Sequence, residues 1–515
     1  MDVQQGTQRS KEIVLEIKEK SKLCIESRKH INGLVDILGN LQSSNENVIV
    51  ASIHGLHSVF HHFLSTSEMY SEVSAVGEDI TGLSKAEQYK LWLRQHYVLT
   101  CNGLVDLLHH SSYKVQELSM TTLMKFIKDE SHNPLQKPTQ GHTFPEQLFK
   151  RLFLCLIPSD KNMQPLFMRF QEYTEFDDVR YFCMQCLNNS LKKEQVSSEQ
   201  VTDVYLSNIF ACLENLNFTE EASSMSNFLS PLPEQTKQTK LTDWREHRKL
   251  FTNVWILFLS FKLTTGLYKK VLMILHDKVI PYVSCPLFLS DFLTESYNVG
   301  GAISLLALNG LFLLVSKYNL DYPDFYKKLY ALFEPSIFHV KYRSRFFYLA
   351  NMFLSSTHLP AYLVASFAKK LSRILLTAPS SGLRLAIPFM LNLVIRHPNL
   401  KVMLNRTNGP TDITSDPYNY DETDPGKSKA LDSCLWELKT LQSHYCPDIV
   451  SQASRIEHPL STTETDLSEL LDITEDEMVE KEVKKKKKDI PLTFEPPKGL
   501  FDTKDDKMQL CWSLQ

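Results

Sequence analysis

The sequence has little of what catalytic loops and disulfide frameworks are built from. Glycine occupies only 16 of the 515 positions, about half its usual share in proteins. This scarcity argues against glycine-rich phosphate loops and turn-dense β architectures, and it favours helices. The ten cysteines are few and scattered, unlike a disulfide framework, and no cationic-then-apolar signal follows Met1. We therefore expect a reducing compartment, the cytosol or the nucleus.

Neither sign of charge predominates. Lysine and arginine number 56 against 60 aspartates and glutamates, which gives a formal net charge of −4. Such a balance excludes a cationic coat for nucleic acid over the whole molecule, although a local patch could still bind phosphate. Hydrophobic residues make up 43% of the chain, which is enough apolar material for a large core.

Motifs that would define an enzyme are also missing. The sequence contains no GxxxxGK[ST], no GxGxxG after a strand, no HExxH and no GxSxG. Cys183 and Cys186 lack a second CxxC at zinc spacing, so we expect both in a helical core. His54, His57 and His61 share one helical face, but no cysteine or carboxylate partner stands at matching spacing. We predict no enzyme, no catalytic residues, no metal and no cofactor.

Two uncharged runs, 296–316 and 346–368, are long enough to cross a bilayer. The first contains Asn298 and Asn309, and the second is interrupted by a Ser-Ser-Thr-His-Leu-Pro corner that ends at Pro360. Buried helices of a large helical core produce the same hydropathy. We expect core helices, with a multi-pass protein of the nuclear envelope as an alternative.

Helical periodicity dominates the chain, and strand-like alternation is almost absent. After a disordered start at 1–9, the segment 10–218 repeats a pattern of apolar and small residues that stand four apart. The copies are Val48, Ser52, Leu56 and Phe60; Val115, Ser119 and Leu123; and Val179, Cys183 and Leu187. A small residue lets two helices approach closely, while the flanking apolar residues fill the seam. The pattern predicts an all-α fold, an α-solenoid of HEAT-like (armadillo-type) helical pairs, with an irregular helical bundle as the alternative.

Three further segments follow the array. A stretch rich in serine, proline, glutamine and threonine at 219–243 predicts a linker. The most apolar part, 244–457, predicts a second helical domain that contains an acidic loop at 405–428. Charges of one sign gather in separate stretches over 458–515, which predicts a charged, largely extended tail.

Three groups of cations are candidate contacts for RNA or an acidic partner. The segment 338–348 interleaves aromatic residues with Lys341, Arg343 and Arg345, a combination that can stack on bases and hold phosphates. Lys369 and Arg373 stand one turn apart, opposite the apolar face of their helix. For both groups we prefer a plain solvated face, with contact to RNA or an acidic partner as the alternative. The third group, a candidate nuclear-import run, is Lys484, Lys485, Lys486, Lys487 and Lys488.

Several spaced motifs occur between about 300 and 450. They are Tyr322-Pro323-Asp324-Phe325-Tyr326, the corner at Pro360 that leads to Phe367, Arg396-His397-Pro398, Asp424-Pro425 and Leu435-Trp436-Glu437-Leu438. Their order and composition resemble those of the CCAAT-binding-factor family of ribosome-assembly proteins. We expect these motif residues to be mostly structural.

The resemblance implies a non-enzymatic assembly factor of the nucleus and nucleolus. It implies a member of the small-subunit processome that forms a heterodimer with nucleolar protein 14 and supports small-subunit rRNA processing and pre-ribosome export. Contact with rRNA would be local, in keeping with the net charge. A nuclear transport receptor, which also uses helical repeats, is the alternative among binding proteins, although it would need more regular repeats.

Overall fold

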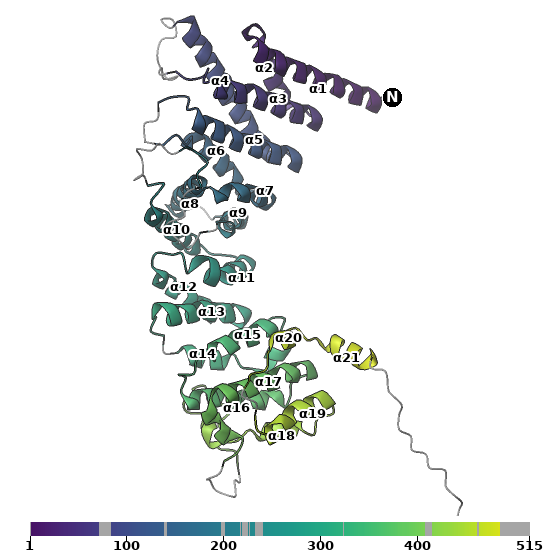
Figure 1. Ribbon diagram of the computed structural model, residues 1–515, viewed down its shortest axis with the longest axis vertical. Coiled ribbons are helices and arrows are strands. Elements are labelled where there is room, and N and C mark those ends of the chain that lie inside the picture. Colours follow the sequence, from purple (N-terminus) through teal and green to yellow (C-terminus); the bar gives the residue numbers. More distant parts are fainter. Residues whose placement is uncertain are drawn as a thin grey trace, which may run out of the picture. The chain divides into compact units, whose positions relative to one another are not determined.

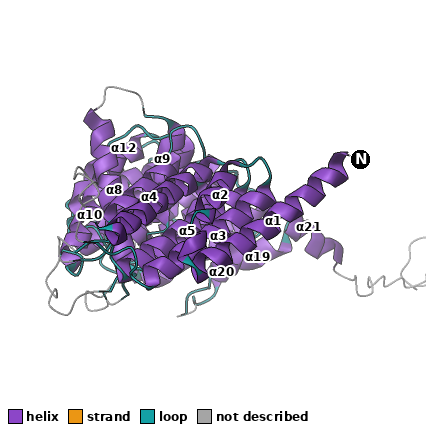
Figure 2. Ribbon diagram, turned by 90° about the horizontal axis from the view of Figure 1, so that it is seen from above, coloured by secondary structure: helices purple, strands orange, loops and turns teal. Residues whose placement is uncertain are grey.

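The computed structural model describes residues 2–71, 84–137, 142–196, 201–216, 218, 225, 227–231, 240–322, 324–406, 415–460 and 463–484. Every regular element within these ranges is a helix, and Figure 2 shows only helices and loops there. The predicted all-α class is therefore confirmed. The chain divides into two compact units, unit 1 at residues 1–325 and unit 2 at residues 326–515.

Unit 1 is a succession of helices joined by short turns and a few longer loops. The α-helices are α1 (Asp2–Glu26), α2 (Gly33–Gly39), α3 (Glu46–Ser65), α4 (Lys85–Asp106), α5 (Tyr113–His132), α6 (Glu146–Leu156), α7 (Gln164–Phe170), α8 (Asp177–Val196), α9 (Asp203–Glu214), α10 (Trp244–Leu259), α11 (Thr265–Ile274), α12 (Ser290–Asn298) and α13 (Gly301–Tyr318). Several begin at a side-chain cap that the sequence supplies, as at Ser84, which forms a reciprocal capping box with Glu87.

The helices of unit 1 stack in two series along the chain. Each odd-numbered helix contacts the next odd-numbered one from α1 to α13, and α4, α6, α8 and α10 form the second series. Consecutive helices join the two series, since α4 and α6 both contact α5. Figure 1 shows this succession from α1 to α13. Nearest-neighbour stacking of helical pairs is the geometry of a solenoid, as predicted.

The repeated small-residue pattern lies on the buried faces of three of these helices. Ser52 in α3, Ser119 in α5 and Cys183 in α8 are all 0% exposed. Helix α4 lies between the first and second copies, and helices α6 and α7 lie between the second and third copies. These intervening helices explain why the copies are separated by more than one helical pair. The pattern therefore marks close helix contacts in the array rather than every repeat.

The N-terminal boundary differs from the prediction. Helix α1 begins at Asp2, so the expected disordered start at 1–9 is wrong. Its buried face is carried by Ile17 and Cys24, further along the same helix, and α1 packs on α3. Polar residues extend a packed helix easily, because each added residue forms one more backbone hydrogen bond on an existing nucleus.

The expected linker at 219–243 does not separate the two units, whose boundary lies at Phe325 instead. Its described part is attached to α8 through Asp178, which is 0% exposed. The Asp178 carboxylate accepts hydrogen bonds from the backbone N–H groups of Leu229 at 3.1 Å and Ser230 at 2.8 Å. Helix α10, which follows this segment, packs on α8. Composition identified a polar stretch, but the buried acceptor that holds it is a tertiary feature.

Within the described residues, α13 is the one helix long and apolar enough to span a membrane by length and composition. It packs against α11 and α12, and 56% of its apolar window is buried inside the unit. The second uncharged run, 346–368, is divided between α15 and α16 by the turn before Pro360. Both runs therefore include helices that pack into the fold, as the expectation of core helices requires.

Unit 2 is built around two long helices, α16 and α17, which pack against each other. Its α-helices are α14 (Phe325–Ala331), which begins at the unit boundary, α15 (Arg343–Phe353), α16 (Ala361–Leu375), α17 (Ser380–Arg396), α18 (Trp436–Leu441), α19 (Pro447–Ala453), α20 (Ser468–Leu471) and α21 (Glu475–Lys484). Helix α18 packs on α16, and α19 packs on α17. Pro360 precedes the first turn of α16, where a missing backbone N–H has no cost.

The tail is less extended than predicted. Residues 463–484, which we call the strap, form α20 and α21, and α20 contacts both α15 and α17. Asn392 and the backbone of Thr465 exchange two hydrogen bonds of 2.8 and 2.9 Å, and Leu467 and Ile473 are buried. These apolar anchors stand within an acidic stretch, which explains why charge composition alone suggested an extended tail. Residues 485–515 lie outside the described residues.

Candidate functional site

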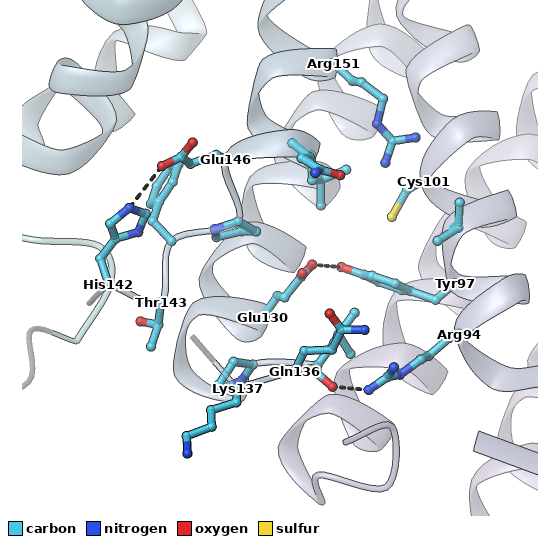
Figure 3. A pocket seen from close by; sticks show the side chains of 17 residues that line it. Arg94, Tyr97, Cys101, Glu130, Gln136, Lys137, His142, Thr143, Glu146 and Arg151 are labelled. Carbon is cyan, nitrogen blue, oxygen red and sulfur yellow. Dashed lines mark hydrogen bonds and ion pairs between the residues drawn. The ribbon is translucent and has the colours of Figure 1, made fainter. Parts of the chain in front are cut away.

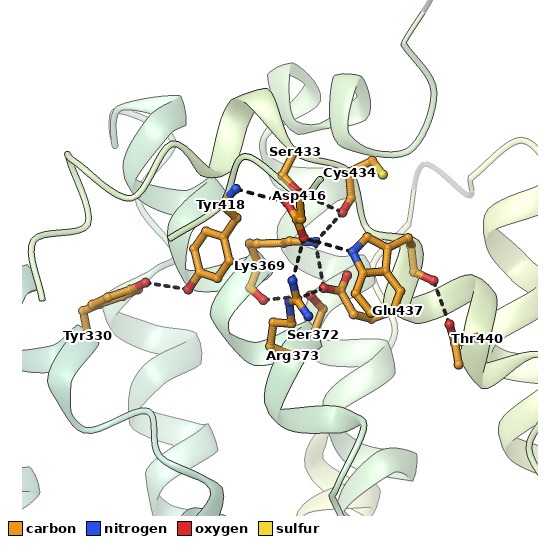
Figure 4. Close-up of polar contacts among 11 residues, drawn as sticks. Tyr330, Lys369, Ser372, Arg373, Asp416, Tyr418, Ser433, Cys434, Glu437 and Thr440 are labelled. Carbon is orange, nitrogen blue, oxygen red and sulfur yellow. Dashed lines mark hydrogen bonds and ion pairs between the residues drawn. The ribbon is translucent and has the colours of Figure 1, made fainter. Parts of the chain in front are cut away.

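The most concentrated polar cluster of unit 2 surrounds Lys369 on α16. The Lys369 side chain is 0% exposed, and its ammonium nitrogen lies 2.7 Å from Glu437 Oε1 and 3.1 Å from Asp416 Oδ2. It also donates to the backbone carbonyl of Cys434 at 2.6 Å. Figure 4 shows these groups converging from three separate segments of the chain. The ammonium group is thus fully enclosed and neutralised, as a buried charge requires.

Arg373, one turn along α16, joins the same cluster. Its Nη2 lies 2.8 Å from Asp416 Oδ2, and its Nε lies 3.0 Å from Glu437 Oε1. The guanidinium carbon stands 4.7 Å from the centre of the Trp436 ring. The indole N–H of Trp436 in turn donates to Asp416 at 3.0 Å. Two cations, two carboxylates and an indole therefore link α16, the acidic loop and α18 (Figure 4).

This arrangement corrects the expectation for Lys369. The helical face opposite the apolar stripe was predicted to face solvent or a partner, but Asp416 and Glu437 cover it. Lys369 is therefore unavailable to RNA or to another protein, whereas Arg373 keeps 29% of its side chain exposed. Trp436 is also partly accessible, at 37% exposed. The sequence signal that could have revealed the cluster is the acidic loop itself, since buried lysines need paired carboxylates.

Asp416 is the electrostatic centre of the cluster. Burial opposes its charge, but hydrogen bonds from Ser433, from Trp436, from the backbone of Tyr418 and from Lys369 outweigh burial and hold its pKa well below the usual range. Its carboxylate is consequently charged at any physiological pH. The described part of the predicted acidic loop thus acts as an internal counter-ion, while 407–414 lie outside the described residues.

The interleaved basic segment is divided between the interior and the surface. Arg343 donates to Ser381 Oγ at 2.9 Å and to the Ile473 carbonyl at 2.6 Å, so the chain's own strap occupies it. Arg345 is half-buried, and Lys341 is exposed. Of the three cations in this segment, Lys341 is the most accessible.

The family-motif residues mainly hold helices together. Phe367 is 1% exposed and packs edge-to-face on Tyr330, with ring centres 5.4 Å apart. The Tyr326 hydroxyl donates to the Phe353 carbonyl at 3.4 Å, and Arg396 Nε donates to Glu464 at 2.6 Å in the strap. These contacts give the motifs a structural explanation.

The remaining motif residues lie at helix boundaries or outside the described residues. Phe325 is buried and contacts Phe312 within unit 1, and Tyr322 is half-buried. Pro398 begins a short 3₁₀ helix and is exposed, whereas burial lowers the pKa of the neighbouring His397. Pro323 lies outside the described residues.

Most of the lysine run also lies outside the residues that the structure describes. Lys484 is the last residue of α21 and pairs with Glu480 at 2.8 Å. Lys485, Lys486, Lys487 and Lys488 lie outside the described residues. Their role in nuclear import stays a prediction.

Unit 1 contains a cavity of about 560 Å³ between α4, α5 and the start of α6. Figure 3 shows charged groups of both signs around it, among them Arg94, Glu130 and Arg151. The Tyr97 hydroxyl donates to Glu130 at 3.0 Å. Burial raises the pKa of Glu130 to about 7, although Tyr97 and the nearby arginines act in the opposite direction.

Two of the groups around this cavity, Arg94 and Cys101, are held in the interior of unit 1. Arg94 donates to the backbone carbonyls of Met69 and Ser71, which is a structural use of its guanidinium. Burial raises the pKa of the neighbouring Cys101 thiol far above its ordinary value and so suppresses a nucleophilic thiolate. No cluster of three or more metal-ligating side chains occurs in the part of the chain that the structure describes. No local sequence pattern points to this cavity, because its walls come from separate helices.

The two-series helical array and the ion-paired helical unit define a helical-repeat class of protein. A family model described as "Nucleolar complex protein 4-like, TPR repeats" matches residues 7–196, and the "CBF/Mak21 family" matches residues 304–453. Nucleolar complex protein 4 homolog A of Xenopus laevis is 46% identical over 94% of this chain and 93% of its own length. The homologs of Gallus gallus and Homo sapiens are 43% and 41% identical, each over 93% of this chain and over 95% and 93% of their own lengths.

The chain belongs to the nucleolar complex protein 4 family, so the resemblance inferred from the motifs is confirmed. Family membership carries a nuclear and nucleolar location and a role in ribosome biogenesis. It favours the ribosome-assembly interpretation over the transport-receptor alternative. The family model assigns TPR repeats to the array that periodicity predicted as HEAT-like; both are stacked helical pairs.

Proposed function

We propose that this chain is a non-enzymatic scaffold of the small-subunit processome, where it forms a heterodimer with nucleolar protein 14. In that particle it supports processing of small-subunit rRNA and export of the pre-ribosome. The observation that carries the proposal is similarity to nucleolar complex protein 4 homologs over nearly the whole chain, 94% in the Xenopus laevis case. A scaffold role also fits a solenoid, whose stacked helices offer long surfaces to a partner chain.

Contact with rRNA is proposed to be local. The formal net charge of −4 gives little general attraction to a polyanion, so phosphate contacts must come from a few exposed cations. Lys341 meets this condition because it is exposed and forms no ion pair within the described residues. Lys369 does not, because it is enclosed with Glu437.

The proposal is tested by affinity purification of the tagged full-length chain from nuclear extract. We expect nucleolar protein 14 at a one-to-one ratio and precursors of small-subunit rRNA, with crosslinks that locate the partner on unit 1 or unit 2. Depletion of the chain should lower mature small-subunit rRNA while large-subunit rRNA stays unchanged. Recovery of large-subunit precursors alone, or a depletion phenotype confined to the large subunit, would contradict the proposal.

A further inference from the structure

Thr474 lies at an unusual position in the strap. It precedes α21, its side chain is exposed, and its hydroxyl accepts a hydrogen bond from the Glu477 backbone at 3.3 Å. Three acids follow it directly: Glu475, Asp476 and Glu477. No other serine or threonine of the chain is followed by three consecutive acids. Kinases select substrates partly by such charge patterns, so the sequence around Thr474 suits an acidophilic serine/threonine kinase.

The surface beside Thr474 carries cations without carboxylate partners. A cavity of about 450 Å³ brings the strap next to the start of α15. It is lined by the strap residues Asp472, Thr474 and Glu475 and by the basic residues His339, Lys341 and Arg343. The described hydrogen bonds of Arg343 go to neutral acceptors, Ser381 and the Ile473 carbonyl. Within the described residues, neither Arg343 nor Lys341 forms an ion pair.

We propose that Thr474 is a phosphorylation site whose phosphate is bound by Lys341 and Arg343. In the transfer, the Thr474 hydroxyl oxygen bonds to the γ-phosphorus of ATP, the bond to the bridging oxygen breaks, ADP leaves, and the hydroxyl proton passes to the kinase. The phosphate adds a charge of about −1.5 to −2 at pH 7 and three strong acceptors, which arginine and lysine bind well. Asp472 and Glu475 oppose this binding, but both are exposed and can turn toward solvent.

The local structure gives a kinase access to Thr474. Once phosphate has been added, the same structure is stabilised by it. Helix α21 has no buried residues and only ten residues, so its first turn can unwind into a kinase cleft at small cost. Ile473, which is 6% exposed, keeps the strap attached next to the site. Once formed, the phosphate stands before the first turn of α21, where negative charge stabilises a helix. Phosphorylation should therefore fasten the strap to α15.

The first experiment tests the modification. The full-length chain is incubated with casein kinase 2, ATP and Mg²⁺, and phosphate at each residue is quantified by mass spectrometry. We expect Thr474 to be a major site, and Thr474→Asn, which keeps a side-chain cap for α21, to remove that signal. Ser468→Ala, at an exposed strap position with one following acid, should leave it unchanged. Absence of phosphate at Thr474 while casein is phosphorylated in parallel overturns the proposal.

The second experiment tests the receiving cations. Hydrogen exchange of the α21 amides is compared between the phosphorylated and unphosphorylated full-length chain. We expect exchange to slow at least fivefold on phosphorylation, and Lys341→Met to remove most of the difference. Lys401→Met, at another exposed lysine of unit 2, should preserve the difference. Equal exchange in both forms, or equal effects of the two lysine variants, overturns the assignment of Lys341.

Discussion

Lys369 and Glu437 form an ion pair of 2.7 Å in which both side chains are 0% exposed, although 68 residues separate them in the sequence. The pair attaches α18 to α16 and belongs to a cluster that also holds Asp416 and Arg373. A buried pair contributes little beyond well-packed apolar residues, but the loss of one partner leaves a charge in the interior. The cluster therefore specifies how the loop and helices of unit 2 assemble.

Lys369→Met should destabilise unit 2 by about 3 kcal/mol, because Glu437 is left with Arg373 alone. The measurement is the local free energy of unfolding from hydrogen exchange of α16 in the full chain. Lys401→Met, which removes an exposed lysine, should change it by less than about 0.5 kcal/mol. The double variant Lys369→Met with Glu437→Leu should recover part of the loss. Unchanged protection in Lys369→Met would show that the pair does not hold the helices.

The stability of unit 2 should fall in acid because of Asp416. Its pKa is depressed in the folded chain, so its contribution is present above the unfolded pKa of about 3.9 and is lost as the pH falls toward the folded value. Asp416→Asn should therefore weaken α16 at pH 6 and flatten the dependence on pH below 4. Hydrogen exchange at several pH values, corrected for intrinsic rates, measures both effects. Asp432→Asn, at an exposed position, serves as the control and should keep the wild-type profile.

Because of Glu130, the stability of unit 1 should depend on pH in the opposite direction. Its pKa is raised to about 7 by burial, so the protonated form is favoured in the folded state. Stability is then fullest below the unfolded pKa of about 4.3 and decreases as the pH rises to 7. Glu130→Gln can still accept from Tyr97, and it should remove this decrease and protect α5 at pH 8. Protection is followed by hydrogen exchange, and Glu19→Gln, at an exposed site, should not alter it.

Asp178→Ala should detach residues 229 and 230 from α8, while Asn227 keeps its hydrogen bonds to Asp177. The carboxylate accepts from the Leu229 and Ser230 backbones, and hydrogen bonds to charged groups contribute about 1.5–3 kcal/mol each. We expect a local loss of about 2–4 kcal/mol, read from exchange of the Leu229 and Ser230 amides. Asp178→Asn retains an acceptor oxygen and should lose less. Equal protection in Asp178→Ala would mean that the segment is held by Leu229 packing instead.

Local sequence rules predicted the helical character of the array and three of its buried faces. Hydrophobic positions at helical spacing and polar turns are properties of neighbouring residues, so the buried faces around Ser52, Ser119 and Cys183 followed directly. The same rules placed Lys369 and Arg373 on α16, opposite its apolar stripe. They could not say what covers that side, since Asp416 and Glu437 come from distant segments.

The unit boundary and the strap likewise depend on tertiary contacts that composition alone does not reveal. Composition marked 219–243 as polar, but whether a polar stretch separates units depends on what it binds, here the buried Asp178. Charge marked the tail as extended, while Leu467 and Ile473 supply the anchors that hold it.

The sequence by itself determined that this protein is helical, that its helices pair in succession, and to which family it belongs. The tertiary structure decided which charges are internal and which are free: Lys369 is enclosed, Arg343 is bound by the strap, and Lys341 faces solvent. The physical reason is that helix formation depends on contacts three and four residues apart, whereas neutralising a buried charge depends on a partner that only the folded chain brings near.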